Sequence, residues 1–191
     1  PPHTHTRARA HTHTPRAAGT YAAKPWTTVC AWREAADWCS AGCGWCGCAD
    51  GGDAGADGSG DDCNVAIVGD IDSTTRITGF TIKNGIGCVY GQGGGIYVES
   101  SSPRLDHLII KDNIGNGGGG ICFNGTSNAI LDEVLIQNNL SGLGGGIFSY
   151  NSNPVITNCT IRNNQSTNGG GVYLTNSSPI IERVSITDNI A

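Results

Sequence analysis

A glycine-headed block occurs four times in the C-terminal half of this 191-residue chain. Each copy has three glycines followed by a β-branched residue, and the copies begin at Gly93, Gly118, Gly144 and Gly169, which lie 25, 26 and 25 residues apart. Self-similarity at a fixed period of this length is typical of solenoids, in which each unit buries its apolar face on the next. The repeat therefore constrains the architecture more than any single residue does.

Apolar and polar residues alternate inside the blocks, as in the pairs Phe80 and Ile82 or Cys159 and Ile161. This period of two predicts strands and not helices. Two aligned columns should form buried stacks, one of Ile96, Ile121, Ile147 and Val172, the other of Ile82, Ile110, Ile136, Ile161 and Ile186. A third apolar column, which includes Leu105, predicts a third short strand. Roughly three strands per block predict an all-β parallel β-helix, in which each strand pairs with its equivalent about 4.8 Å away.

The polar residues of the blocks fit the corners of such a fold. Consecutive glycines allow positive φ and close backbone approach, and Asn tolerates the left-handed conformation. We expect one aligned column of asparagines to form a structural ladder of side-chain amides, at Asn113, Asn139, Asn164 and Asn189.

These motifs carry a family resemblance. The pattern Gly-Gly-Gly-Ile-Tyr, Ser-Ser-Pro-x-Leu/Ile and Ile-x-Asn-Asn, with the stretch from Arg76 to Gly85, resembles right-handed parallel β-helix proteins of the pectin-lyase-like superfamily. It is also similar to the repeats of polymorphic outer-membrane and adhesin-type surface proteins. The resemblance implies a single-stranded parallel β-helix of about four to five rungs over residues 64–191. It implies no single activity, because the superfamily includes lyases, hydrolases, epimerases and non-catalytic surface proteins.

The first third of the chain lacks the repeat. Residues 1–20 are a low-complexity segment of mostly His-Thr and Arg-Ala dipeptides, for which we expect disorder. Residues 21–63 form an irregular segment rich in Cys, Gly and Asp. Its cysteines fit disulfides better than a zinc site, because the spacer of a zinc ribbon is missing. Its aspartates fit a solvated linker better than a Ca²⁺ site, so we expect no metal or other cofactor and keep Ca²⁺ as the less favoured alternative.

Composition excludes some functions. Charged residues make up 14% of the chain, the net charge is −5, and no basic stripe points to nucleic acid. No apolar run has the length of a membrane span. The last block ends without a polar cap, so we expect either a fragment of a longer solenoid or end-to-end self-association.

Two surfaces are candidate sites. A lyase or hydrolase of this fold would need gathered carboxylates, and the candidate catalytic residues are Asp106, Asp132, Glu133, His107 and Arg183. A solvated turn column is the favoured interpretation of that group. Tyr97, Phe148 and Tyr173, with Cys122 in the same column, should line an outward face, where exposed rings would contact carbohydrate, the N-terminal segment or another subunit. Sequons that would carry N-glycans on exposed corners are Asn124, Asn139, Asn158, Asn164 and Asn176.

The favoured hypothesis is a secreted or cell-surface, non-catalytic β-helix module for carbohydrate contact, adhesion or filament assembly. Its expected partners are polysaccharides, glycans or further copies of the chain. The alternative is a polysaccharide lyase or glycoside hydrolase of the pectin-lyase-like superfamily. Binding and cleavage assays with pectin and alginate would discriminate the two.

Overall fold

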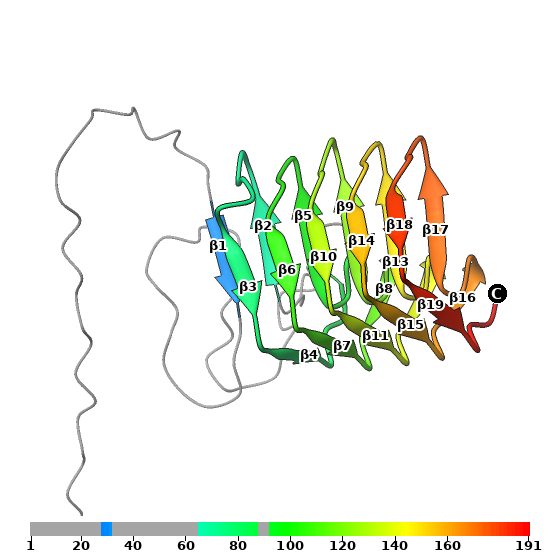
Figure 1. Ribbon diagram of the computed structural model, residues 1–191. Helices are drawn as coiled ribbons and strands as arrows, with labels where there is room; N and C mark the ends of the chain where they lie inside the picture. Colours follow the sequence, from blue (N-terminus) through cyan, green and yellow to red (C-terminus); the bar gives the residue numbers. More distant parts are fainter. Residues whose placement is uncertain (1–27, 32–64, 88–91) are drawn as a thin grey trace, which may run out of the picture.

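The computed structural model describes residues 28–31, 65–87 and 92–191. Within these residues the chain is an all-β solenoid that makes four complete turns between β2 and β17 (Figure 1). Sheet A contains β1 (Thr28–Ala31), β2 (Val65–Val68), β5 (Ile96–Glu99), β9 (Ile121–Asn124), β13 (Ile147–Tyr150) and β17 (Val172–Thr175). Sheet B contains β3 (Arg76–Thr78), β6 (Arg104–Asp106), β10 (Ile130–Asp132), β14 (Val155–Thr157) and β18 (Ile180–Glu182). Sheet C contains β4 (Thr81–Lys83), β7 (Ile109–Lys111), β11 (Leu135–Gln137), β15 (Thr160–Arg162) and β19 (Ser185–Thr187). Sheet D contains β8 (Ile114–Gly117), β12 (Leu140–Leu143) and β16 (Gln165–Asn168).

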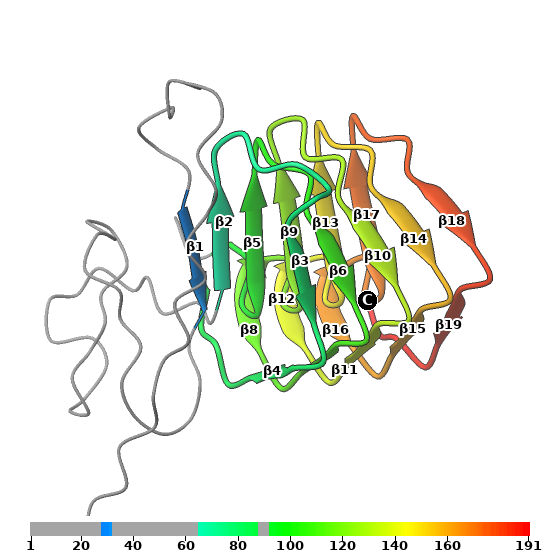
Figure 2. The ribbon, with the colours of Figure 1, turned by 60° about the vertical axis from the view of Figure 1, so that its left-hand side comes forward.

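Strand pairing follows the sequence repeat. Every strand from β2 onward pairs in parallel with its equivalent in the adjacent rung, so that Ile96 lies beside Ile121 and Ile110 beside Ile136. The predicted all-β parallel fold, its register and its number of rungs are therefore confirmed. Figure 2 shows the strands of each sheet side by side along the axis of the solenoid.

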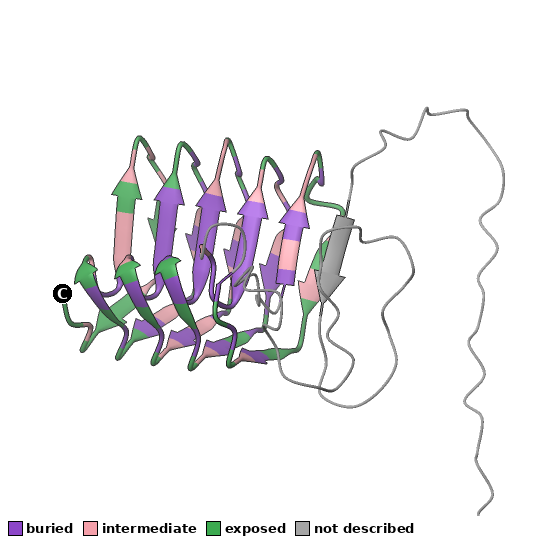
Figure 3. Cartoon of the chain, turned by 180° about the vertical axis from the view of Figure 1, so that it is seen from behind, coloured by how far each residue is buried: buried purple, intermediate pink, exposed green. Residues whose placement is uncertain are grey.

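The core is the stack of inward side chains. Ile121, Ile136 and Ile147 are completely buried, as the two predicted columns require. In the last rung Val172 is half-buried and Ile186 is exposed, because in the structure each has a rung on one side only. Figure 3 shows this change from buried strands in the central rungs to more exposed ones near the C-terminus.

Sheet D is a fourth strand per rung that the sequence pattern did not predict. Its inward positions are held by Gly115, Ser141 and Ser166, which are buried without being apolar. Two apolar residues of this sheet, Ile114 and Leu140, point outward and are exposed. A pattern search for buried apolar residues therefore finds no strand here, although the backbone pairing is regular.

A second difference concerns the segment 21–63, which was expected to be irregular. It contains β1, which pairs antiparallel with β2 from Thr28 opposite Val68 to Ala31 opposite Val65. The rest of this segment and residues 1–20 lie outside the described residues, together with the predictions made for them. Among the described residues, no helix has the length and hydropathy of a membrane span.

The asparagine ladder is confirmed at the corner between sheets C and D. The Nδ2 of each asparagine donates to the Oδ1 of the asparagine in the next rung at 2.9–3.0 Å, from Asn113 to Asn139, from Asn139 to Asn164 and from Asn164 to Asn189. Each Nδ2 also donates to a backbone carbonyl of the preceding rung, as from Asn139 to Ile110. The third glycine of each triplet packs against this ladder and against the core stack. A Cβ on Gly120 would lie 2.8 Å from Ile136 and 3.2 Å from Asn139, so the close packing of stack and ladder requires glycine there.

Candidate functional site

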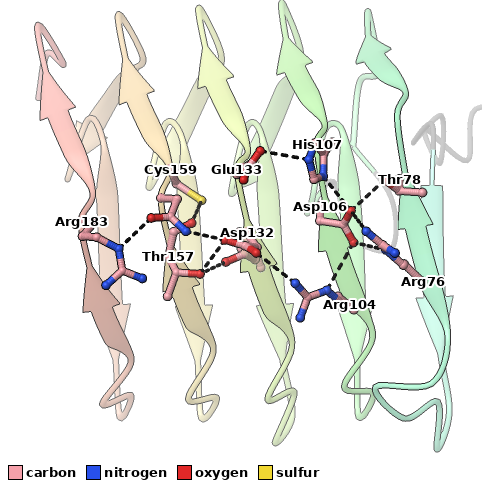
Figure 4. A network of polar contacts seen from close by, with 12 residues as sticks. Arg76, Thr78, Arg104, Asp106, His107, Asp132, Glu133, Thr157, Cys159 and Arg183 are labelled. Carbon is pink, nitrogen blue, oxygen red and sulfur yellow. Dashed lines mark hydrogen bonds and ion pairs between the residues drawn. The ribbon is translucent and has the colours of Figure 1, made fainter.

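The predicted acid, His and Arg constellation lies on the outer face of sheet B and on the turn that follows it (Figure 4). Asp106, Asp132, Thr157 and Glu182 share one register column, and Thr78 begins it. The adjacent turn column has positive φ in every rung and consists of Gly79, His107, Glu133, Asn158 and Arg183. With Arg76 and Arg104 of sheet B, these polar residues form what we call the carboxylate network.

Asp106 is the centre of the carboxylate network. Its Oδ1 and Oδ2 accept hydrogen bonds from Arg76 Nε at 2.6 Å and Nη2 at 2.7 Å, in a bidentate pair. Thr78 donates to Oδ2 at 2.7 Å, and Arg104 Nε lies 3.5 Å from Oδ1. The hydrogen bonds from Arg76, with those from Thr78 and His107, hold the pKa of Asp106 well below its usual range. The side chain has no exposed surface, because these neighbours form a single layer over it.

His107 connects Asp106 to the next rung. Its Nδ1 lies 2.9 Å from Asp106 Oδ2, and its Nε2 lies 2.9 Å from Glu133 Oε2. A carboxylate only accepts hydrogen bonds, so both contacts are made at once when both ring nitrogens carry a proton. The ring therefore lies between carboxylates of two adjacent rungs, within hydrogen-bond distance of both.

Asp132 is bonded on both oxygens. Arg104 Nη2 donates to Oδ2 at 2.9 Å, while Thr157 and Asn158 donate to Oδ1 at 3.0 and 2.8 Å. The Asn158 and Thr157 hydrogen bonds lower the pKa of Asp132. Arg183 lies farther along the solenoid, where its Nε donates to Asn158 at 2.7 Å.

All five catalytic candidates thus lie in one network. Its hydrogen bonds and ion pairs link neighbouring rungs of the solenoid. Asp106 stays ionised at neutral pH because its pKa is lowered, so it is unsuited to the role of general acid. It is also covered, so no substrate atom reaches it. Sequence reasoning missed Arg76, Arg104 and Thr78. The signal was present, because Arg104 lies two residues before Asp106 and so on the same face of the strand.

The predicted aromatic column is a real register column on the outer face of sheet A, from Tyr97 through Cys122 and Phe148 to Tyr173. Its predicted exposure is wrong. Tyr97, Cys122 and Phe148 are buried in a second apolar cluster with Leu143 of sheet D, and only Tyr173 is half-buried. Phe148 and Tyr173 stack with ring centroids 5.8 Å apart. The reason is sheet D, whose strands fold against this face; a Cβ on Gly117 would lie 2.9 Å from the Phe148 ring.

A pocket of about 330 Å³ lies where sheets A and D meet. Aromatic and amide side chains line it, together with one glycine and one leucine: Gln92, Asn116, Gly117, Asn124, Leu143, Phe148 and Tyr150. Tyr150 and Asn124 share a second outward column of sheet A with Glu99 and Thr175, two residues after the aromatic column. We call this hollow the A–D pocket.

Several polar groups of the A–D pocket keep hydrogen-bonding capacity. Asn124 Nδ2 donates to the Tyr97 hydroxyl at 3.0 Å and to Glu99 at 3.2 Å, and Gln92 Oε1 accepts from the Cys122 thiol at 3.4 Å. Burial raises the pKa of that thiol to about 12, so it remains a donor. Within the part of the chain that the structure describes, Asn124 Oδ1, Gln92 Nε2 and the Tyr150 hydroxyl make no hydrogen bond, and all three residues line the pocket.

Sequence reasoning named Asn124 only as a sequon and missed Tyr150, although the alternation Phe148-x-Tyr150 was available as a signal. Gln92, Asn116 and Leu143 had no signal, because sheet D was not recognised. Of the five sequons, Asn158 and Asn176 are exposed and Asn124 is half-buried. Asn139 and Asn164 are buried in the ladder, so the expectation of exposed glycan sites is wrong for these two.

The two cysteines in residues 65–87 and 92–191 are both free thiols. Cys159 is buried in the inward column, as expected of a small core residue, and Cys122 is buried beside the pocket. No three His, Cys, Asp or Glu side chains gather as metal ligands in residues 65–87 and 92–191. The aspartates considered for Ca²⁺ lie outside those ranges.

The family model described as "Right handed beta helix region" matches residues 60–191, which is more than half of the chain, so the chain belongs to this family. No curated protein and no solved structure matches the chain.

Proposed function

We propose that this right-handed β-helix protein is a non-catalytic carbohydrate-contact module of a secreted or cell-surface protein, and that the A–D pocket is its contact site. The observation that carries the proposal is the lining of that pocket. Rings of Phe148 and Tyr150 lie beside the amides of Asn116 and Asn124 in one hollow. Small-molecule sites combine apolar surface with a few convergent polar groups in this way, and 330 Å³ lies at the low end of their usual volumes, about 300–1,000 Å³.

The carboxylate network supports the non-catalytic part of the proposal. Its two central acids already use both oxygens for bonds within the protein, and Asp106 is fully covered. A hydrolase of two carboxylates needs one of them protonated at the start of the reaction. The hydrogen bonds that lower the pKa values of Asp106 and Asp132 oppose this state. The fold also supports contact with a long polymer, because equivalent outer positions recur at each rung along the solenoid.

The test is affinity electrophoresis of the whole chain in gels that contain soluble polysaccharides, with Tyr150→Ala as the pocket variant. Tyr150 and Ile109 are both 40% exposed on outer sheet faces, so Ile109→Ala on sheet C is a matched control. We expect at least one polymer to retard the protein, the retardation to be lost in Tyr150→Ala, and Ile109→Ala to behave as the parent. Retention by no polymer, or equal retention of all three proteins, would overturn the proposal.

The same polymers, incubated with the protein and analysed for reducing ends and for unsaturated products, test the enzymatic alternative. We expect no cleavage above a buffer control, with or without added Ca²⁺. Cleavage that disappears in Asp132→Asn would show that the network is a catalytic site and that the non-catalytic proposal is wrong.

A further inference from the structure

The charged residues of the solenoid are divided between its faces. After residue 64 the chain has six Lys and Arg residues, at Arg76, Lys83, Arg104, Lys111, Arg162 and Arg183. All of them lie on strands of sheets B and C or, for Arg183, on the turn between those sheets. Sheets A and D carry no cation between Val65 and Thr175 in the residues that the structure describes.

The A–D pocket therefore has a distinct electrostatic character. Among the described residues, the carboxylate of Glu99 is a charge in contact with its lining, because it accepts a hydrogen bond from Asn124 at 3.2 Å. A carboxylate or sulfate on a ligand would meet this negative charge without a compensating Lys or Arg among the described lining residues. Like-charge contacts of this kind select against a partner.

The free polar groups of the pocket match hydroxyl groups. Asn124 Oδ1 accepts, Gln92 Nε2 donates, and the Tyr150 hydroxyl does both. A sugar hydroxyl donates and accepts, so it satisfies each of these groups. A ligand carboxylate only accepts, so it would leave Asn124 Oδ1 unsatisfied.

We infer that the A–D pocket selects neutral glycans, such as hexose polymers without carboxylate or sulfate groups, over acidic ones. This inference rests on the proposed carbohydrate contact and narrows it to one chemical class. Aromatic rings and amides provide the contact, and Glu99 provides the discrimination against polyanions.

The experiment compares neutral probes (dextran, xyloglucan, soluble β-glucan) with acidic probes (polygalacturonate, alginate) by affinity electrophoresis and by titration calorimetry. We expect at least one neutral probe to bind at least tenfold more tightly than either acidic probe. Because a neutral ligand makes no ion pair, its affinity should change less than about twofold between 50 and 500 mM NaCl. Preference for an acidic probe, or an affinity that falls steeply with salt, would overturn the inference while leaving carbohydrate contact intact.

A charge variant sharpens the test. Glu99→Gln keeps the size of the side chain and the hydrogen bond from Asn124, and it removes the negative charge. We expect the affinity for the neutral probe to stay within twofold of the parent. The ratio of the affinity for the neutral probe to that for the acidic probes should fall by at least threefold. An unchanged ratio would contradict the role given to Glu99. Binding of no probe of either class would instead refute the carbohydrate proposal itself.

Discussion

The asparagine ladder and the carboxylate network both tie neighbouring rungs together, but they do so in different ways. The ladder repeats one residue, is buried, and has the same hydrogen bonds in each rung. The network lies on an outer face and changes its residues from rung to rung. The cause is chemical. An amide has a donor and an acceptor, so it pairs with a copy of itself, whereas a carboxylate has only acceptors and repels its copy.

Asp106 and Asp132 show the consequence of stacking like charges. They are register neighbours, so their charges lie one rung apart. Arg104 reaches toward both of them, at 3.5 Å from Asp106 and 2.9 Å from Asp132, and Arg76 neutralises the first. In the next rung the column changes to Thr157, a hydroxyl that donates to Asp132. A charged column in a solenoid therefore needs alternating partners, and a neutral amide column does not.

Asn139→Ala should give the largest loss of stability, because it breaks the ladder in the middle. The change removes the acceptor of the Asn113 backbone N–H and of Asn113 Nδ2, and the donor to Ile110 and Asn164. Buried donors without partners cost about 1–3 kcal/mol each, so we expect a loss of about 3–5 kcal/mol in the free energy of unfolding. Urea denaturation followed by circular dichroism measures it.

The control for that variant is Asn138→Gly. Asn138 is the exposed neighbour with φ of 56°, and glycine keeps this backbone conformation without strain. We expect a change below about 1 kcal/mol. A ladder variant no less stable than this control would show that the amide stack contributes little.

Asp106→Asn should have a smaller effect at pH 7, although it removes the centre of the carboxylate network. Arg76 and Arg104 are 53% and 37% exposed, so water replaces their lost partner. We expect a loss of about 1–2 kcal/mol, also from urea denaturation. The matched control is Asp112→Asn, an exposed carboxylate 3.3 Å from Lys111 at a positive φ that Asn tolerates, and it should change stability by less than about 0.5 kcal/mol. Equal effects of the two variants would contradict the central role of Asp106.

The asparagine ladder and the carboxylate network should also differ in their response to acid. The folded-state pKa of Asp106 lies below its ordinary value of 3.8, and that of Asp132 is also lowered. The folded protein therefore binds fewer protons than the unfolded chain near pH 3–4, so the stabilisation is present above about pH 4 and is lost as the pH falls through the folded pKa.

Urea midpoints measured from pH 7 to pH 2 test this difference. The parent should lose stability more steeply below pH 4 than Asp106→Asn does. Asn139→Ala should run parallel to the parent, because no ladder group titrates in this range. Parallel curves for the parent and Asp106→Asn would rule out the carboxylate as a source of acid sensitivity.

Much of the fold was predictable because its information repeats. The columns of Ile136 and Asn139 recur at fixed spacing, so each rung confirms the register of the others. Sheet D was not predictable, because Gly115 and Ser141 fill its inward positions and carry no apolar signal. The positions of Asp106, His107 and Glu133 followed from the register. Their bonding did not, because it depends on which arginine rotamers reach across a rung.

The A–D pocket was even less predictable from the sequence than the carboxylate network. The column of Phe148 was predictable, but its burial was not, since burial comes from a sheet without a sequence signature. A site between two sheets needs both of them to be recognised. Sequence periodicity predicts which residues share a face, and it does not predict which faces are covered.

Arg183→Gly should give the smallest effect and test whether the network acts as one unit. Arg183 holds φ of 53°, a conformation that costs an L-residue about 1–2 kcal/mol and glycine little, and Gly79 occupies this turn column in the first described rung. Its bonds to Asn158 and Glu182 are exposed, so they contribute about 0–1 kcal/mol. The two terms offset each other, and we expect unfolding free energy to change by less than about 0.5 kcal/mol. Arg183→Ala, which loses the bonds and keeps the strain, should be slightly less stable than Arg183→Gly. Arg183→Gly could instead lower the free energy of unfolding as much as Asp106→Asn does. The hydrogen bonds of the network would then be cooperative along the solenoid, and in this respect the network would resemble the asparagine ladder.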